Sequence, residues 1–401
     1  MNTILRNPKI IVPSAMAVFL VFGVVFSVVS KTYNAPDERM HHAYVVSVAD
    51  GRLPKLSAEK IDQEAYHPPL YYLLLAPVER MARHLPERWE ILMLRWETLL
   101  LASVVIPLTW WLGKLLFPNY PLVSFVAPWF IALHPQFLYM SGVINNDTLA
   151  TLFATIGFCC IARSALSVPT QRTIVITGIA VTAMFLTKAS IWPIAAITFL
   201  TAASSLRRRD IPLALTMCVP LIAAAAWWFH RNLVLYGDLT SLRLQKELWY
   251  ASAHRDFLTF HGIKSWFQTV YESSWARFGY FTIALGRWWY RLSYLFGSFA
   301  VISGASFLSQ TWRTFSTRQR RTFIVLGVAA AVHVASMFFY STVFYQAQGR
   351  FLLPLISLGA LLAAIAAQSV PIRFRAATVA VMMAFLAAMD VQSILILLRH
   401  S

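Results

Sequence analysis

The chain has 401 residues, of which 58% are hydrophobic and only 13% are charged. A soluble domain of this length carries about a quarter charged residues, so this composition excludes an ordinary soluble protein and predicts an all-α polytopic membrane protein. The formal charge is +17. Because the basic residues lie between apolar runs, we attribute the charge to membrane topology and anionic lipids, and we expect no nucleic-acid partner. The three cysteines lie inside apolar runs, which argues against disulfides and cysteine metal sites.

Apolar runs near the length that crosses the hydrocarbon recur along the chain and predict about eleven transmembrane helices. The first is too long for a signal-peptide core and is interpreted as an uncleaved helix. We expect one domain over residues 1–401, with no internal repeat. The predicted spans are Ile10–Val29, Leu92–Leu112, Pro121–Tyr139, Thr148–Ala165, Thr173–Leu186, Ser190–Ser205, Ile211–Phe229, Trp289–Ser309, Thr322–Ser341, Phe351–Gln368 and Ala376–Leu398.

Basic residues in the short connections predict the orientation of these helices. With the N-terminus inside, the short outer connections carry only Lys188 and Arg350, in agreement with the positive-inside rule. The C-terminus is then outside. The basic residues assigned to the inner side are Arg6, Lys9, Lys114, Arg163, Arg172, Arg207, Arg208, Arg209, Arg313, Arg318, Arg320, Arg321, Arg373 and Arg375.

Two outer segments, Lys31–Ile91 and Arg231–Trp288, are too long to be turns and are rich in aromatic residues, proline and charge. Within the first, Met40–Ala49 and Leu70–Ala82 have apolar residues at helical spacing with polar residues between them. This pattern is typical of helices that lie in the membrane interface without crossing it.

The first outer segment contains the motif Pro36-Asp37-Glu38, followed by His41 and His42. One interpretation is structural, because proline and acidic residues commonly start a helix. The other is functional. Asp37 shares a helix face with His41, and Glu38 shares one with His42, so these carboxylates could serve as a general base or hold a cation.

The other polar motifs at outer helix ends each have a structural explanation too. His67-Pro68-Pro69-Leu70-Tyr71-Tyr72 is a helix start with an aromatic belt, or a place where His67 and Tyr71 contact a sugar. Asn145-Asn146-Asp147 can be a helix cap, and Lys188 can extend to the interface. Taken together, however, the motifs bring two acidic groups and several cations to one membrane face. That set fits a hydroxyl nucleophile and a phosphate leaving group, and it comprises Asp37, Glu38, Asp147, Lys188, Arg231 and Arg350.

The order of these motifs resembles the GT-C superfamily of membrane glycosyltransferases. Pro-Asp-Glu is followed by Gly51-Arg52-Leu53-Pro54, His-Pro-Pro-Leu-Tyr-Tyr, Asn-Asn-Asp-Thr-Leu-Ala, Leu-Thr-Lys, Arg-Asn-Leu-Val-Leu-Tyr-Gly-Asp and Gln-Gly-Arg-Phe-Leu-Leu-Pro. The chain is most similar to an uncharacterised bacterial branch of predicted membrane proteins, related to protein mannosyltransferases and to the lipid A aminoarabinose transferase. The resemblance covers Thr32 to about Pro354.

The resemblance implies a GT-C-like fold in the bacterial inner membrane and a polyprenyl-phosphate sugar donor. Transfer would occur on the periplasmic side, with inversion at the anomeric carbon, to an acceptor hydroxyl of an envelope glycan, lipid or protein. Asp37 matches the usual catalytic carboxylate and Asp147 a second acidic position, with Glu38 as their neighbour. The residues expected to bind substrate are His41, His67, Tyr71, Asn146, Lys188, Arg231, Gln348 and Arg350.

No metal is expected to be required, as in the mannosyltransferase and aminoarabinose transferase relatives. A divalent cation remains possible, and its candidate ligands are Asp37, Glu38, Asp147, His41 and His67. Two other functions stay open from the residues alone. The first is a transporter or flippase for a lipid-linked saccharide, which would have charges at mid-membrane and two related halves. The second is an inactive scaffold subunit of a polysaccharide assembly complex, one that has lost its activity. The sugar and the acceptor are not readable from the sequence.

Overall fold

The structure, a computed structural model, describes residues 7–57, 64–249 and 257–400. Arg6, counted above among the inner basic residues, lies outside these ranges. The described residues are helical apart from loops and one antiparallel hairpin, in which Arg277 pairs with Ala284 and Phe278 with Ile283. The elements are α1 (Pro8–Val29), α2 (Glu38–Ala49), α3 (Leu70–Ala82), α4 (Glu87–Ser103), α5 (Val105–Leu116), α6 (Pro121–Ala132), α7 (Pro135–Ser141), α8 (Asp147–Leu166), α9 (Gln171–Thr187), η3 (Ala189–Ile191), α10 (Trp192–Ala203), η4 (Arg208–Asp210), α11 (Ile211–Tyr236), α12 (Leu242–Trp249), α13 (Phe260–Ala276), β1 (Arg277–Phe278), β2 (Ile283–Ala284), α14 (Arg287–Thr311), η6 (Trp312–Thr314), α15 (Thr317–Val343), η7 (Gly349–Leu355), α16 (Ile356–Ser369) and α17 (Ile372–Leu398).

The all-α polytopic fold is confirmed. In the described part of the chain, 8 helices are long and apolar enough to cross a membrane, or up to 9 if the bent pair α6–α7 is one span. The predicted count of about eleven is not confirmed. Two of the predicted spans correspond to shorter apolar helices, Gln171–Thr187 and Ala189–Ala203. Their lengths fall below the ~20 residues that cross the hydrocarbon without tilting or thinning.

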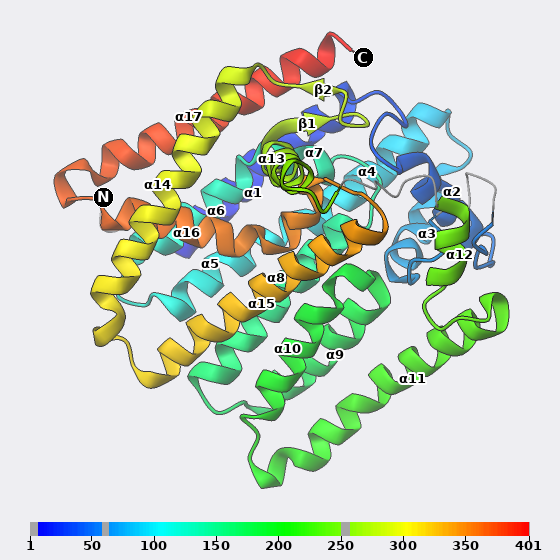
Figure 1. The fold of residues 1–401 in the computed structure, drawn as a ribbon, viewed down its shortest axis with the longest axis horizontal. Helices are drawn as coiled ribbons and strands as arrows, with labels where there is room; N and C mark the ends of the chain where they lie inside the picture. Colours follow the sequence, from blue (N-terminus) through cyan, green and yellow to red (C-terminus); the bar gives the residue numbers. More distant parts are fainter. Residues whose placement is uncertain (1–6, 58–63, 250–256, 401) are drawn as a thin grey trace.

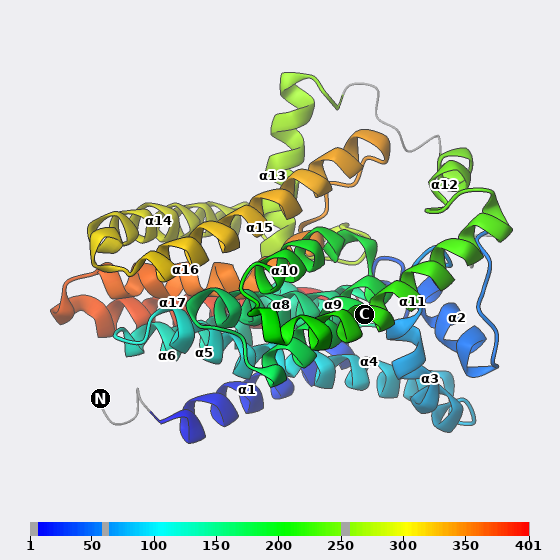
Figure 2. The same cartoon turned by 90° about the horizontal axis from the view of Figure 1, so that it is seen from below.

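The long helices run side by side, and three helices of the two long segments lie at one end of the bundle (Figure 1). Helices α2, α3 and α12 lie at this end, whereas the connections α14–α15 and α16–α17 lie at the other (Figure 1). Helix α13 stands steeply against the bundle when the molecule is turned (Figure 2). The two predicted interfacial helices are present, as α2 and α3.

One span is broken at Pro135, where α6 and α7 meet at 56°. Proline at the first position of α7 cannot continue the hydrogen bonding of α6, and His134 caps the new helix by accepting from the amide of Phe137. All of α7 is buried. The break leads the chain through the buried turn Gly142–Asn146 to Asp147, which begins α8.

A buried ion pair joins the start of α2 to α1 and α4. Arg95 donates to both carboxylate oxygens of Glu38, at 2.7 and 2.8 Å, and to the carbonyls of Ser27 and Ser30 at the end of α1. Glu38 also accepts from the amide of Ile144 in the α7–α8 turn. The guanidinium nitrogens of Arg95 and the carboxylate oxygens of Glu38 therefore all have hydrogen-bond partners, as a buried charge pair requires. The pair sets where α2 begins.

Candidate active site

A cavity of about 580 Å³ opens where α2, η3, α15 and η7 approach one another. Asp37, Lys188 and Arg350 lie together and form a polar end of it. The rest of the lining mixes polar side chains with apolar ones such as Leu248 and Met337. A cavity that offers both charged and apolar side chains suits a ligand that joins a polar head to a hydrocarbon chain. Further lining residues are His41, Glu64, Tyr66, His67, Ala189, Ser190, Pro193, His333, Ser336, Tyr340, Phe344, Gln346, Gln348 and Phe351.

The polar end contains two carboxylates and two cations in alternation. Arg350 forms an ion pair with Asp37, and its Nε lies 3.8 Å from Oδ2 of Asp147. Lys188 Nζ lies 2.6 Å from Oδ1 of Asp147 and 2.9 Å from the amide oxygen of Asn146. Asp147 Oδ2 has no hydrogen-bond partner. The two positive and two negative charges of the cluster cancel. Because the site has a low dielectric constant, each cation interacts strongly with any charge nearby.

Local backbone geometry presents Asp37 and Arg350 to each other. Asp37 caps α2 with φ 63°, a left-handed conformation that Asp and Asn adopt more readily than most residues. Arg350 follows Gly349 at the start of η7, and the amide of Gly349 donates to Ser273 Oγ of α13 at 2.8 Å. A Cβ at Gly349 would overlap the backbone of α13. Glycine is therefore required for the close approach that places Arg350.

Electrostatics keep Asp37 ionised. Burial is the largest single effect and opposes ionisation of its carboxyl, but the charge and hydrogen bond of Arg350, with smaller contributions from His41 and Lys188, together lower the pKa of Asp37 below its usual value. The side chain of Asp37 is 26% exposed, whereas that of Arg350 is 4% exposed. Asp37 is thus the member of the pair that a molecule entering the cavity can reach.

Two histidines form one wall. His41 Nδ1 lies 2.9 Å from the hydroxyl of Tyr72, and burial lowers the pKa of His41 to about 4, so its ring is neutral. His67 Nε2 lies 2.9 Å from a carboxyl oxygen of Glu64, and burial raises the pKa of Glu64 to about 7. Nδ1 of His67 is buried and has no hydrogen-bond partner.

Several residues expected in the site lie outside the cavity wall. Glu38 is engaged by Arg95, and the hydroxyl of Tyr71 meets Thr98 Oγ1 at 2.7 Å and accepts from the amide of Asn145. Asn146 lies behind Lys188 and is fully buried. Arg231 donates to the carbonyl of Pro54 and lies over the ring of Trp228. The residues that the structure brings together are Asp37, His41, His67, Asp147, Lys188, Gln348 and Arg350.

Known structures share this architecture. The crystal structure of ArnT, the lipid A aminoarabinose transferase, from Cupriavidus metallidurans bound to undecaprenyl phosphate matches with TM-score 0.54 and 16% identity, over 96% of this chain and 64% of that one. Its apo state matches with TM-score 0.51 and 15% identity, over 92% and 61%. The Archaeoglobus fulgidus oligosaccharyltransferase in complex with Zn and sulfate matches with TM-score 0.50 and 14% identity, over 94% and 53%.

The fold is that of the GT-C glycosyltransferases. The fold expected from the motif order is thereby confirmed. This chain spans less than two thirds of the length of each of these structures. No family model and no curated protein matches the sequence.

Within this GT-C fold, two charged residues had not been assigned a role from the sequence. Glu64 lines the cavity three residues before His67, a spacing that pairs them in a helical turn. Arg95 lies inside the predicted span Leu92–Leu112, and an arginine within a span is a signal for a buried partner. The sequence therefore indicated that Arg95 has a buried partner, but it did not indicate that the partner is Glu38.

The predicted metal ligands do not form one group in the described residues, because Glu38 turns to Arg95 and Asp147 turns to Lys188. The group of imidazole and carboxylate ligand atoms that does come together in the described chain is His42, Glu79 and Glu90, on another side of α2.

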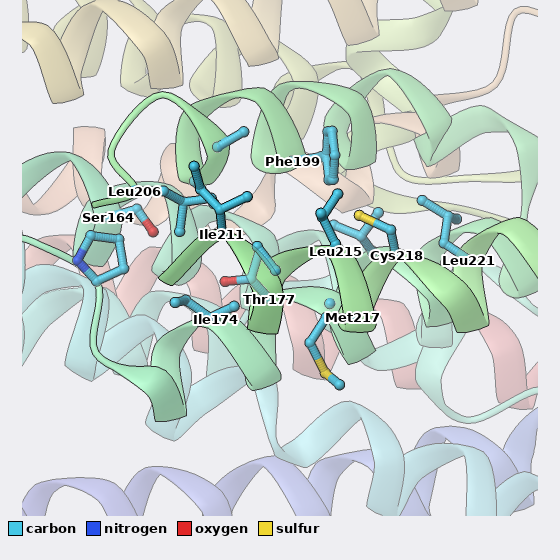
Figure 3. A pocket seen from close by; sticks show the side chains of 16 residues that line it. Ser164, Ile174, Thr177, Phe199, Leu206, Ile211, Leu215, Met217, Cys218 and Leu221 are labelled. Atoms are coloured by element: carbon cyan, nitrogen blue, oxygen red, sulfur yellow. The ribbon is translucent and has the colours of Figure 1, made fainter. Parts of the chain in front are cut away.

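A second cavity of about 170 Å³ lies between α9, α10 and α11. Figure 3 shows its wall, in which Ile174, Leu215, Met217 and Cys218 predominate. No charged side chain lines it. The second cavity therefore lacks the groups that acid–base chemistry or phosphate binding needs.

Proposed function

We propose that this chain is a GT-C-type glycosyltransferase of the bacterial inner membrane. It moves a sugar from a polyprenyl-phosphate donor to an acceptor hydroxyl on the periplasmic face, with inversion at the anomeric carbon. The observation that carries the proposal is the cavity whose lining joins Asp37, Arg350 and Lys188, backed by Asp147, to apolar side chains such as Leu248, Met337 and Phe344. ArnT, which has the same fold, is bound to undecaprenyl phosphate, a ligand with a charged head and an apolar chain.

In this proposal Arg350 and Lys188 bind the donor phosphate. A guanidinium can hold two phosphate oxygens at once, and Lys188 adds a compact charge beside it. Both cations are buried, so their attraction for an anion is little weakened by water. The polyprenyl chain then lies along the apolar wall formed by Leu248, Met337 and Phe344.

Asp37 takes the proton of the acceptor hydroxyl as that oxygen attacks the anomeric carbon. The new bond is from the acceptor oxygen to carbon, and the bond that breaks joins carbon to the phosphate oxygen, which keeps the electron pair. Charge therefore moves to the phosphate, where Arg350 and Lys188 stabilise it. Attack from the face opposite the leaving group inverts the configuration. Asp147 orients Lys188 through their 2.6 Å ion pair.

Donor binding also prepares the base. Without donor, Arg350 holds Asp37 as an ion pair, which makes its carboxylate a weak base. A phosphate that draws the guanidinium toward itself weakens this pair and raises the basicity of Asp37. The base is thus strengthened only when a donor is present, which limits unproductive proton removal.

The test uses the full chain in lipid nanodiscs with a panel of undecaprenyl-phosphate sugars, and follows release of undecaprenyl phosphate by mass spectrometry. We expect release with at least one donor by the wild type, and loss of release in Asp37→Asn. Asp50→Asn, which alters an exposed carboxylate paired with Arg83, is the control and should retain activity. Equal release by wild type and Asp37→Asn would overturn the mechanism. Failure to bind any lipid phosphate by native mass spectrometry would overturn the proposed substrate class.

A further inference from the structure

A second cluster of ionisable side chains lies on the side of α2 that turns away from the cavity. His41 lines the cavity, and His42, about 100° further round the helix, faces α3 and α4 instead. His42 Nε2 lies 3.1 Å from Oε1 of Glu90 and 3.5 Å from Oε2 of Glu79. The side chains of His42, Glu79 and Glu90 are 11%, 2% and 15% exposed. Three helices thus each contribute one ligand atom to a nearly closed space.

The other ring nitrogen of His42 is held by Tyr33. Nδ1 lies 3.0 Å from the hydroxyl of Tyr33, and either group can be the donor. When Nδ1 carries the proton of the neutral ring and donates to Tyr33, Nε2 presents a lone pair toward Glu79 and Glu90 and can bind a cation. Without a cation, Nε2–H can donate to Glu90.

Glu79 is the second observation that points to a missing cation. It is buried, and its Oε2, the atom that faces His42, has no hydrogen-bond partner. The nearest cation on its other oxygen is Arg83, whose Nε is 3.9 Å away. A buried carboxylate oxygen without a partner is destabilising. A cation placed between Glu79, Glu90 and His42 would pair this oxygen and offset the charge of both carboxylates.

We propose that His42, Glu79 and Glu90 bind a divalent transition-metal ion of the Zn²⁺ class. Tetrahedral zinc with ligand bonds of about 2.1 Å places neighbouring ligand atoms about 3.4 Å apart. The separations from His42 Nε2 are 3.1 and 3.5 Å, and all three ligand atoms lie within 4.8 Å of one another. One imidazole with two carboxylates favours zinc over Mg²⁺ or Ca²⁺, which prefer oxygen ligands alone. Water completes the fourth position.

The chain already holds the ligands in place. Tyr33 orients the His42 ring through Nδ1, as the partners of metal-bound histidines ordinarily do. The ion would join α2 to α3 and α4 beside the residues that carry the cavity wall. It lies on the opposite side of α2 from the cavity, so the inference does not depend on the proposed transferase activity.

The test measures metal on the purified full chain, after EDTA treatment and dialysis against ZnCl₂. We expect about one zinc per chain by inductively coupled plasma mass spectrometry, together with a rise in Tm when ZnCl₂ is added. Cobalt(II) in place of zinc should give the intense visible absorption of a low-coordinate site. Absence of retained zinc and of any shift in Tm would overturn the proposal and favour a proton shared between Glu79 and Glu90.

Variants then locate the ion. Glu90→Gln is expected to fold, because Glu90 is the most exposed of the ligands, and to lose the zinc and the cobalt absorption. His42→Gln should lose both as well. Asp50→Asn, at the end of the same helix α2 and paired with Arg83, is the matched control and should keep both. Retention of zinc by Glu90→Gln and His42→Gln would show that the ion binds elsewhere and would end the proposal.

Discussion

At the scale of single residues, two adjacent carboxylates have separate partners. Asp37 faces the cavity and Arg350, whereas Glu38 is fully buried and bonded to Arg95. Because Asp37 has a positive φ, the backbone directs the two side chains apart. Substitution of Asp37 should therefore reduce catalysis, whereas substitution of Glu38 should reduce the stability of the fold.

Asp37→Asn should reduce sugar transfer about 100- to 10,000-fold, the usual range for loss of a positioned base. Asn tolerates the left-handed backbone at this position, so the fold should remain intact. Transfer rate and Tm in detergent are the two measurements. Near-normal turnover by a folded Asp37→Asn variant would remove Asp37 as the base.

Glu38→Gln should instead lower the stability of the protein. Removing one charge of a buried pair leaves Arg95 uncompensated, which costs about 3–5 kcal/mol. Chemical denaturation in detergent measures this cost. Combining Glu38→Leu with Arg95→Met removes both charges and should restore part of the stability that Glu38→Gln loses. A double variant no more stable than Glu38→Gln would argue against the ion pair.

Arg350→Lys should weaken donor use without fully abolishing it. Lysine keeps the charge but cannot form the two-point contact of a guanidinium, and it also loses the bonds to Gln348 and to the carbonyl of Pro36. Initial rates at limiting donor should fall more for Arg350→Ala than for Arg350→Lys. Arg373→Ala, at the opposite end of the bundle, serves as control. Unchanged rates in Arg350→Ala would take Arg350 out of the site.

Glu64 should make stability depend on pH near neutrality. Burial raises its pKa from 4.5 to about 7, so the folded chain binds this proton more tightly than the unfolded chain. Its contribution is fully present below pH 4.5 and is lost as pH rises through about 7, by up to about 3 kcal/mol. Tm should fall across this range in the wild type and less in Glu64→Gln. Glu247→Gln, an exposed change, should leave the slope as it is.

At the scale of elements, the short helix η7 depends on its contact with α13. Gly349 has no space for a side chain, because Ser273 and Ser274 lie directly against it. Gly349→Ala should therefore displace η7, move Arg350 away from Asp37 and reduce transfer, with a smaller effect on folding than on activity. Gly327→Ala in α15 meets nothing within 4 Å and should be silent. Equal activity of the two variants would show that η7 does not set the position of Arg350.

At the scale of the whole molecule, the orientation in the membrane can be tested directly. A cysteine at Ser57 should react with an impermeant maleimide added from the periplasmic side, and one at Ser316 should not, because the basic residues of the α14–α15 connection predict an inner location. Cys218 is the native cysteine that is not buried, so the test uses a Cys218→Ser background. Protection at Ser57 with labelling at Ser316 would reverse the topology and the proposed side of reaction.

The membrane class, the long segments between spans and most spans were predictable from the sequence because they depend on local properties. Hydropathy over about twenty residues decides whether a helix can cross a bilayer, and basic residues in adjoining loops favour its orientation. The same local reasoning predicted α2 and α3 from the spacing of their apolar residues. The predicted count of about eleven spans is not confirmed, because α9 and α10 are apolar but shorter than the other spans.

Only the tertiary structure decided which charged residues are partners. Arg350 and Asp37 are 313 residues apart, Lys188 and Asp147 are 41 apart, and Arg95 and Glu38 are 57 apart. Hydropathy and spacing carry no information about pairing at such separations, so Asp37 and Glu38 looked alike in the sequence. Burial then separates them, because each buried charge must have a partner and the fold offers a different one to each. Composition determined that this chain belongs in a membrane, and the packing of distant helix ends determined where its charges meet.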